Sequence, residues 1–356
     1  MKRPSLVLWE RQERLAHFRE AERLRRRGVR RISKSQRYVA PGPEITAPHR
    51  IELLGTSGRE LVKFLRACAR TVLDLRQPVR LNFRFTQSMT APAMIVLFAE
   101  VDRLVTMAEF PKPVTIVDPR LRRPREVLKQ IGLYEVTGDR CDLVPERRDV
   151  VYWKATKGKD QSGDKLAMLE SIADQVNKDH ASQLELSGVW RGVSEAVANS
   201  VEHAYKFPRQ DAFQGLPETR WWMFTQVRDG VFTIAVCDLG CGYKATINQS
   251  VPEKFLIEVL ATLGLGTNRD AAAVHAAMTY GRSGTKQSER GKGSRDAISV
   301  LAKHGNGDLT ILSNTGWMKY EYEAGKETSA TSGDLGIDIR GTIVWWKLYL
   351  RNEDHD

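Results

Sequence analysis

The chain has 356 residues, which is long enough for two domains of ordinary size. Hydrophobic residues make up 41% of it and charged residues 28%, the balance of a soluble globular protein. It has no apolar run of about eighteen residues and no apolar segment behind the basic N-terminus, so we expect a cytoplasmic protein with neither a transmembrane helix nor a secretory signal. The cysteines at 68, 141, 237 and 241 lack the paired spacing of a zinc site and are expected to be small buried residues.

Most of the net charge of +11 lies near the N-terminus. Residues 1–37 hold thirteen lysines and arginines and four glutamates, a net charge of +9, so the rest of the chain is close to neutral. A local basic patch attracts a polyanion such as a nucleic acid, or an acidic protein surface. We predict a basic helix over residues 1–37 and a linker over 38–50, which contains Pro41, Pro43 and Pro48.

Residues 51–155 alternate between helix and strand patterns. The predicted helices are Ser57–Leu75, Ala91–Met107 and Pro124–Ile131. The predicted strands, which alternate with them, are Val79–Phe85, Val114–Val117 and a strand within Leu143–Trp153. This alternation is typical of an α/β domain. Residues 156–164 are polar and contain glycine, which predicts a domain boundary.

Residues 165–350 combine long helices with antiparallel strands, which predicts an α+β two-layer sandwich. The predicted helices cover residues 165–206, 252–264, 270–280 and 294–304. The predicted strands cover Trp221–Val227, Val231–Cys237, 308–313 and Thr342–Leu350, with a polar loop over 324–340. The pair Asp229-Gly230 between the first two strands is typical of a hairpin turn.

Three segments of this half carry polar groups suited to chemistry, and the first is a predicted helix. Glu195, Asn199 and His203 are spaced i, i+4 and i+8, so they lie on one side of it. The Asn199 carboxamide oxygen could ligate Mg²⁺ together with phosphates and water. The Glu195 carboxylate, one turn away, could orient or deprotonate an attacking water. A solvated polar face of the helix is the alternative interpretation.

The second segment is an apolar strand that ends in Asp238 and continues through Gly240 and Gly242. Glycines allow the backbone to approach a ligand closely. A buried aspartate at the end of a strand needs a hydrogen-bond donor, and the exocyclic amino group of adenine would be one. An ordinary turn is the alternative interpretation.

The third segment is rich in glycine and opens a predicted helix. Backbone N–H groups at a helix N-terminus form a site for phosphate, and Lys292 could add charge. The spacing is not that of a P-loop, and no Rossmann fingerprint is present. The candidate phosphate-binding residues are Gly284, Thr285, Gly291, Lys292, Gly293 and Ser294.

The order and spacing of these segments resemble the GHKL superfamily, which includes DNA gyrase B subunits, mismatch-repair ATPases, histidine kinases and anti-sigma-factor serine kinases. The likeness covers roughly residues 165–350. Glu195–Tyr205 resembles the N-box of the anti-sigma kinases, Asp238–Gly242 the G1 box, and Gly291–Gly293 the G2 box. Gly341–Val344 resembles the closing strand of the family.

This resemblance implies a Bergerat ATP-binding fold with ATP and Mg²⁺ as cofactors. Asn199 would bind Mg²⁺, and Glu195 would be the general base. Asp238 would bind adenine, supported by Thr342 through water. The glycine loops would wrap adenine and phosphates, and residues 243–290 would form a lid over the nucleotide that is longer than in the small kinases.

The N-terminal half resembles the STAS domain of anti-anti-sigma factors in its order of elements. Leu81–Leu104 is similar to the strand, loop and helix that carry the phosphorylatable serine of that family, and Val114–Val117 is similar to its last part. Where the family has Asp-Ser-Ser-Gly, this chain has Ser88-Met89-Thr90-Ala91-Pro92, without the Asp and the Gly. The favoured interpretation is therefore a degenerate STAS-like interaction scaffold, and Ser88 or Thr90 as a phosphorylated hydroxyl group is the alternative.

Three functions are compatible with these features. The first is a slow Mg-ATP-dependent ATPase that acts as a conformational switch, with the STAS-like domain or the lid binding a protein partner. The second is a serine/threonine kinase of the anti-sigma-factor type. The third is a nucleic-acid-associated effector or defence component regulated by ATP, with residues 1–37 contacting phosphates. A homodimer is an expectation from the family alone, and His180 is a poor candidate for a histidine-kinase phosphoacceptor.

Overall fold

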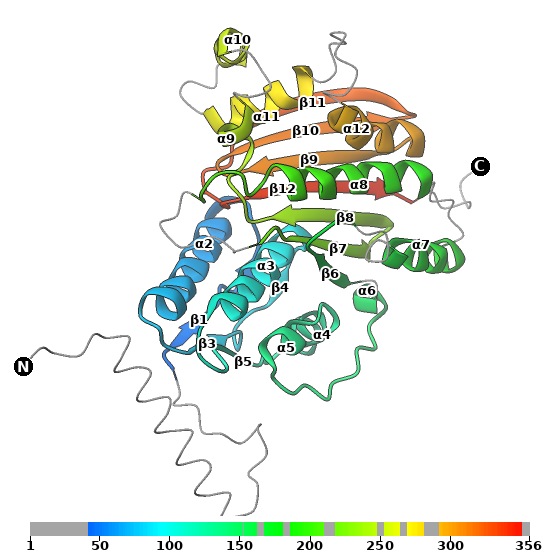
Figure 1. The fold of residues 1–356 in the computed structure, drawn as a ribbon. Helices are drawn as coiled ribbons and strands as arrows, with labels where there is room; N and C mark the ends of the chain where they lie inside the picture. Colours follow the sequence, from blue (N-terminus) through cyan, green and yellow to red (C-terminus); the bar gives the residue numbers. More distant parts are fainter. Residues whose placement is uncertain are drawn as a thin grey trace, which may run out of the picture. The chain divides into compact units, whose positions relative to one another are not determined.

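The computed structural model divides into two compact units, Met1–Ala40 and Pro41–Asp356. It describes residues 42–151, 153–161, 167–180, 186–209, 218–247, 253–263, 269–280 and 292–350. The predicted basic helix over residues 1–37 lies outside the described residues. The described fold, drawn in Figure 1, therefore belongs to the second unit.

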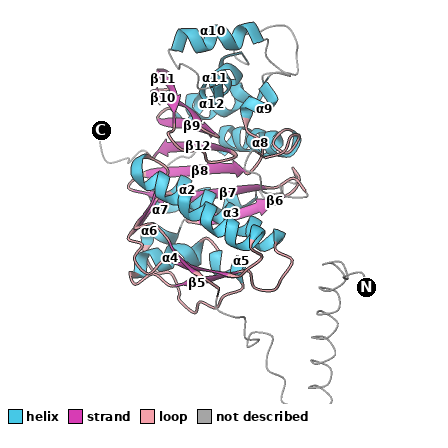
Figure 2. Cartoon of the chain, turned by 90° about the vertical axis from the view of Figure 1, so that its left-hand side faces the viewer, coloured by secondary structure: helices cyan, strands magenta, loops and turns pink. Residues whose placement is uncertain are grey.

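A seven-stranded antiparallel sheet, here called the large sheet, is the central element of this unit. Its strands follow the order β11-β10-β9-β12-β8-β7-β6, as Figure 2 shows. They are β6 (Lys154–Gly158), β7 (Trp221–Arg228), β8 (Val231–Asp238), β9 (Gly307–Ser313), β10 (Gly316–Glu323), β11 (Lys326–Asp334) and β12 (Thr342–Tyr349). Asp229 and Gly230 have φ values of 52° and 70° between β7 and β8, which confirms the predicted hairpin turn.

Helices from the second half of the chain cover one face of the large sheet. They are α7 (Ala167–His180), α8 (Leu186–Glu202), α11 (Arg269–Tyr280) and α12 (Lys292–His304). Two further helices, α9 (Tyr243–Ile247) and α10 (Glu253–Leu263), pack against α11. Alternate strand residues such as Met223, Ile234 and Trp346 form one core with Val193 and Val197 of α8.

The opposite face of the large sheet packs against the first half of the chain. Here α3 (Ala91–Met107) contacts β7 and β8, and α2 (Gly55–Ala69), which continues in a π-helical turn (Arg70–Asp74), lies next to α3. The intervening strand residues Trp222, Phe224 and Cys237 belong to this second core. Because both faces are covered, β7 and β8 are buried at nearly every position instead of at every other one.

The first half of the chain contains two small parallel sheets and three further helices. The strands β1 (Glu44–Thr46), β3 (Val79–Asn82) and β5 (Val114–Val117) form one sheet, and β2 (Arg50–Ile51) pairs with β4 (Ser88–Met89). The helices are α4 (Arg122–Gln130), α5 (Leu133–Thr137) and α6 (Arg148–Val151). Since α3 contacts both β5 and the large sheet, it is buried from Ala91 to Leu104, which accounts for its apolar sequence. The unit is a mixed α/β structure.

Three expectations from the sequence are wrong. The linker predicted over residues 38–50 contains strand β1, which pairs with β3 in a parallel sheet. The strand predicted within Leu143–Trp153 is replaced by helix α6 at Arg148–Val151, and strand β6 begins only at Lys154. A short apolar segment does not reveal by its pattern whether it is a helix or a strand, and this one is apolar because Val150 and Trp153 are buried.

The polar loop predicted over residues 324–340 contains strand β11, which pairs with the unpredicted strand β10. As an edge strand exposed along most of its length, β11 has no apolar face, so its sequence resembles a loop. Other expectations hold: α3 and β5 match their predicted ranges, and all four cysteines are buried and free. No described helix is long and apolar enough to cross a membrane.

Candidate functional site

Helix α8 positions the first pair of candidate residues. Its buried residues Val193 and Val197 face the large sheet, while Glu195 and Asn199 lie half-buried at its side. The Asn199 Nδ2 donates a hydrogen bond to Glu195 Oε1 at 3.4 Å. The amide oxygen of Asn199 is thereby left to ligate a cation, and hard oxygen ligands are those that Mg²⁺ prefers.

The surroundings of Glu195 make its carboxylate more basic. Burial raises the pKa of Glu195, and the nearby carboxylates of Asp296 and Glu202 raise it further, against a smaller opposing effect of the Asn199 hydrogen bond. A carboxylate whose pKa is raised toward neutrality is a more effective general base. Glu195 therefore has the chemistry expected for activating water or a hydroxyl group.

The two helices α8 and α12 run antiparallel in close contact. A Cβ atom on Gly188 would meet Lys303, and one on Gly192 would lie 2.5 Å from Val300 Cγ2. Further along α8, Glu195 lies near enough to the Asp296 carboxylate for that charge to raise its pKa, and Arg191 Nη1 lies 3.9 Å from Asp296 Oδ1. Later residues of α8 thus contact earlier residues of α12. The N-terminus of α12 therefore lies beside the C-terminal half of α8, which carries Asn199. A helix N-terminus presents N–H groups and a partial positive charge, which attract phosphate.

Asp238 ends strand β8 and is 5% exposed. Its Oδ1 accepts a hydrogen bond from the Gly240 N–H at 2.9 Å, and its Oδ2 accepts one from Ser200 Oγ on α8 at 3.4 Å. Burial raises the pKa of Asp238 to about 6, although hydrogen bonds from Gly240, the Thr342 N–H and Ser200 work in the opposite direction. Asp238 is thus a buried carboxyl group held between β8, β12 and α8.

The glycines after Asp238 are required by the packing of the chain itself. A Cβ atom on Gly240 would lie 2.2 Å from the Ala204 carbonyl oxygen, and one on Gly242 would lie 2.4 Å from Asn314 Nδ2. Gly242 also has φ of 75°, a conformation that favours glycine. The Cys241 N–H donates to the Ala204 carbonyl at 2.7 Å, which fixes this turn against the end of α8.

His203 is separated from the other candidate residues of its helix. It follows the last residue of α8, its side chain is 47% exposed, and its Nδ1 lies 3.0 Å from Lys206 Nζ. Burial lowers the pKa of His203, and Lys206 lowers it further against a smaller effect of Glu202. The structure therefore groups His203 with the exposed charges of a turn, and not with Glu195 and Asn199.

The glycine-rich segment is described only in part. Gly284, Thr285 and Gly291 lie outside the described residues. Lys292, Gly293 and Ser294 are the first residues of α12, so the segment opens a helix as predicted.

Several residues around the Asp238 turn were not expected from the sequence. Ser313 Oγ accepts a hydrogen bond from the Tyr243 N–H at 2.9 Å, and Asn314 Nδ2 donates to the Cys241 carbonyl at 3.2 Å. Asp270, at the start of α11, accepts from Thr315 Oγ1 at 2.9 Å. Asn314 has φ of 51° in the β9–β10 turn. Its place in the sequence Ser-Asn-Thr-Gly, which is typical of a turn, is the feature from which this residue could have been predicted.

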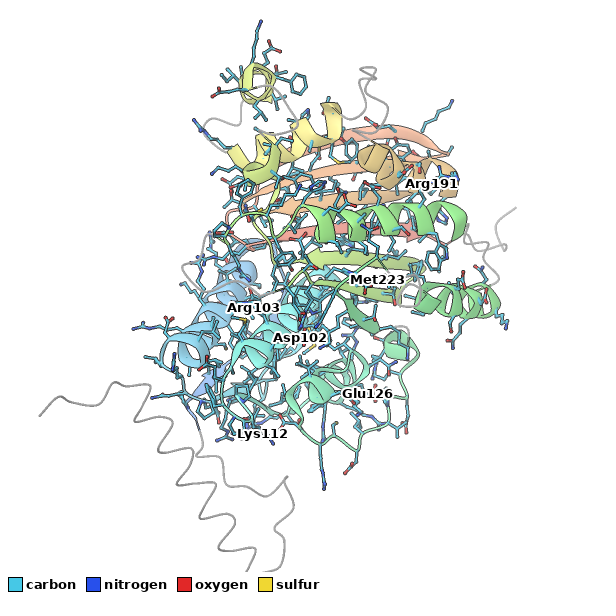
Figure 3. All side chains as sticks on the ribbon, viewed as in Figure 1. Asp102, Arg103, Lys112, Glu126, Arg191 and Met223 are labelled. Carbon is cyan, nitrogen blue, oxygen red and sulfur yellow. The ribbon has the colours of Figure 1, made fainter. Side chains whose placement is uncertain are left out.

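The two faces of the large sheet differ in the groups that they carry. Figure 3 labels Arg191 on α8, Met223 on β7 and Asp102 on α3. The candidate residues Glu195 and Asn199 belong to α8, which covers one face of the large sheet. On the other face, Trp222 Nε1 donates a hydrogen bond to Asp102 Oδ2 at 3.1 Å. Within the described residues, no cluster of three or more His, Cys, Asp or Glu side chains is arranged to bind a metal.

Comparisons with known proteins do not name a family. No protein-family model matches the chain, and a search of curated proteins gave no match.

Proposed function

We propose that residues 165–350 form a GHKL-type ATP-binding domain of the Bergerat fold, and that the protein is a slow Mg-ATP-dependent ATPase. In this proposal Asn199 binds Mg²⁺, Glu195 is the general base, and Asp238 with Thr342 binds adenine. The N-terminus of α12 binds phosphates, and α9 to α11 belong to the lid. The first half of the chain, with its parallel sheet β1-β3-β5, is the STAS-like regulatory domain.

The observation that carries the proposal is the meeting of three distant segments at the C-terminal half of α8. Ser200 of α8 bonds Asp238 across 38 positions of sequence. Asp296 of α12 lies near enough to Glu195 to raise its pKa. The base, the amide, the buried aspartate and a helix N-terminus thus belong to one region, as a nucleotide site requires.

Replacement of Glu195 tests the catalytic part of the proposal. We expect Glu195→Gln to lower ATP turnover about a hundredfold or more, since general bases contribute on that order, while Mg-ATP binding survives. The measurements are phosphate release and calorimetric titration with a non-hydrolysable ATP analogue. Glu60→Gln is the matched control, because Glu60 is an exposed carboxylate of α2, on the opposite face of the large sheet. Absence of analogue binding to the unaltered protein would overturn the proposal as a whole.

A serine/threonine kinase is the second candidate, favoured by the N-box resemblance. Transfer to the chain's own Ser88 or Thr90 is disfavoured, because these residues lead into α3, on the face of the large sheet opposite α8. Ser88 Oγ is also buried, and Thr90 Oγ1 donates to the Ile51 carbonyl. With labelled ATP, phosphate in solution supports the ATPase, and phosphate on protein supports the kinase.

A further inference from the structure

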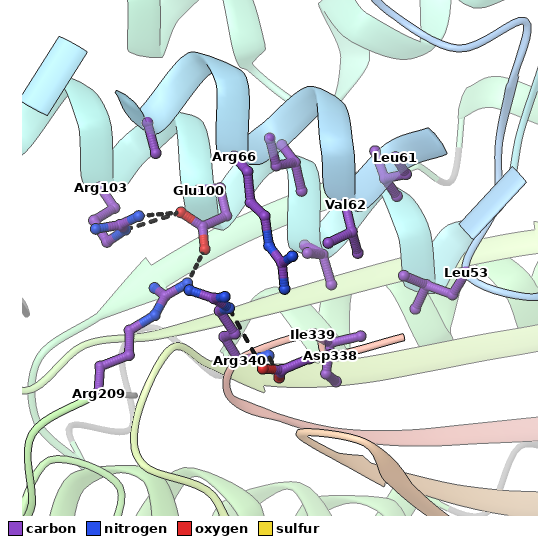
Figure 4. Close-up of a pocket in the computed structure, with 13 residues that line it drawn as sticks. Leu53, Leu61, Val62, Arg66, Glu100, Arg103, Arg209, Asp338, Ile339 and Arg340 are labelled. Carbon is purple, nitrogen blue, oxygen red and sulfur yellow. Dashed lines mark hydrogen bonds and ion pairs between the residues drawn. The ribbon is translucent and has the colours of Figure 1, made fainter. Parts of the chain in front are cut away.

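Two groups of arginines lie around the first half of the chain, and one of them is buried. It surrounds a cavity of about 30 Å³ between α2, α3 and the segment that leads into β12, here called the arginine cavity (Figure 4). There Glu100 forms ion pairs with Arg103 and Arg209. Asp338 forms one with Arg340. The cavity holds one or two water molecules and has no room for a larger ligand.

The second group of arginines is exposed at one end of the small parallel sheet β1-β3-β5. The three strands run in the same direction, so the segments that follow them emerge at the same end of the sheet. Backbone hydrogen bonds hold these segments together. The Gln87 N–H donates to the His49 carbonyl at 2.7 Å, and the Arg120 N–H donates to the Arg84 carbonyl at 3.2 Å. We call this end the strand-end surface, which consists of residues 47–50, 83–88 and 118–122.

The strand-end surface carries a stack of planar side chains. The Phe85 ring is 42% exposed, and the His49 ring lies against it, with centroids 6.2 Å apart and an angle of 22° between the ring planes. The guanidinium group of Arg120 lies over the Phe85 ring, with its Cζ atom 5.0 Å from the centroid. His49 and Arg120 are exposed as well. The stack is therefore open to solvent, and a further planar group can be added to it.

Two arginines of the strand-end surface have no counter-charge. Arg84 and Arg120 are exposed, and neither forms an ion pair with a carboxylate among the residues that the structure describes. The one carboxylate of this surface, Asp118, pairs instead with Arg125 at 2.8 Å. The other two arginines of the surface are each paired with a glutamate. Arg84 and Arg120 thus offer positive charge to an anionic partner.

These features fit a single-stranded nucleic acid. Unpaired bases stack on the rings of Phe and His and on the plane of an arginine, and arginines also contact phosphates. The amide of Gln87, exposed two residues after Phe85, can donate to and accept from the edge of a base. A duplex keeps its bases stacked on one another and offers mainly its phosphates. An acidic protein segment pairs with arginines but makes no use of the planar stack.

We propose that the strand-end surface binds a single-stranded nucleic acid, with a base stacked on the planar groups around Phe85 and phosphates bound by Arg84 and Arg120. The binding is assigned to residues of the second unit, whereas the sequence alone pointed to residues 1–37. It is also separate from the proposed ATPase activity, because none of these residues belongs to the proposed nucleotide site.

The test is an anisotropy titration of the full chain with a labelled single-stranded oligonucleotide of mixed sequence, at constant ionic strength and without ATP. We expect binding to the unaltered protein, and binding about tenfold weaker in Phe85→Ala, since one stacked base contributes on that order. Phe85→Tyr keeps the ring and should bind as the unaltered protein does. Leu75→Ala is the matched control, because Leu75 is an exposed apolar residue that precedes β3, at the opposite end of the sheet. Every variant retains residues 1–37, so any contribution from them cancels.

The salt dependence of binding measures the contribution of the arginines. Arg84→Gln should weaken binding and reduce the slope of log Kd against log salt concentration by about 0.7, the value for one phosphate contact with a single strand. Arg70→Gln should leave the slope unchanged, because Arg70 is an exposed arginine that follows α2 and does not belong to the strand-end surface. Circular dichroism establishes that each variant is folded.

The identity of the ligand is tested with RNA, with DNA and with a polyglutamate peptide. Binding of either nucleic acid supports the proposal, and the tighter of the two names the ligand. The proposal is overturned if neither single strand binds, or if Phe85→Ala binds them as Leu75→Ala does. It is also overturned if Phe85→Ala weakens only the binding of polyglutamate, which would assign the surface to an acidic protein segment. Phe85→Ala should bind Mg-ATP unchanged, so failure of the nucleotide site is seen separately.

Discussion

At the residue scale, Asp238 is the side chain whose ionisation has the clearest consequence for stability. Its pKa of about 6 in the folded chain exceeds the ordinary value of 3.8, so the native state keeps a proton that the unfolded chain has lost between these pH values. The stabilisation from this group is complete below pH 4 and is lost as the pH rises through 6. Above that, burial of the carboxylate costs up to about 3 kcal/mol.

We therefore expect Asp238→Asn to stabilise the nucleotide-free protein at pH 8 and to change its stability little near pH 4. The same variant should lose Mg-ATP binding if Asp238 accepts a hydrogen bond from adenine. Urea unfolding at the two pH values and calorimetric titration measure the two effects. A variant that is less stable than the original chain at pH 8 would show that the hydrogen bonds to the carboxylate outweigh its burial.

At the scale of the elements, the contact between α8 and α12 depends on the absence of a side chain at Gly192. Alanine has the higher helix propensity, by about 1 kcal/mol, but its Cβ atom would lie 2.5 Å from Val300 Cγ2. We expect Gly192→Ala to destabilise the protein by about 1–3 kcal/mol, the usual cost of overpacking. The free energy of unfolding in urea is the measurement.

The double variant Gly192→Ala/Val300→Ala serves as the internal control for this contact. Removal of the Val300 methyl groups makes room for the new Cβ atom, so the two losses should not add. If the losses of unfolding free energy in the two single variants add up to the loss in the double variant, the closest contact of position 192 is not with Val300. The helices would then have moved apart in the single variant.

The elements also show where sequence patterns are sufficient and where they are not. The range of α3 could be predicted because its composition and length determine a buried helix. The strand β11 could not, because an exposed edge strand needs no apolar residues. Of the candidate site, Glu195 and Asn199 were predictable because their contact is local to one helix. The bond from Ser200 to Asp238, and the cavity lined by arginines, join residues far apart in the sequence and have no local signature.

At the scale of the whole molecule, the large sheet depends on both halves of the chain. Trp222, Phe224 and Cys237 are buried against the first half, and each is at most 1% exposed. We expect a fragment of residues 154–350 to expose this apolar face and to aggregate or bind a hydrophobic dye, in contrast to the full chain. Size-exclusion chromatography and dye fluorescence measure this. A monomeric, dye-free fragment would show that the second half folds independently.

The short segment from Asp338 to Thr342 belongs to both faces of the large sheet. Asp338 and Arg340 line the arginine cavity, and two residues later the Thr342 N–H donates to the buried Asp238 carboxylate. A backbone change in this segment would therefore affect both the wall of the arginine cavity and the carboxylate that we propose binds adenine.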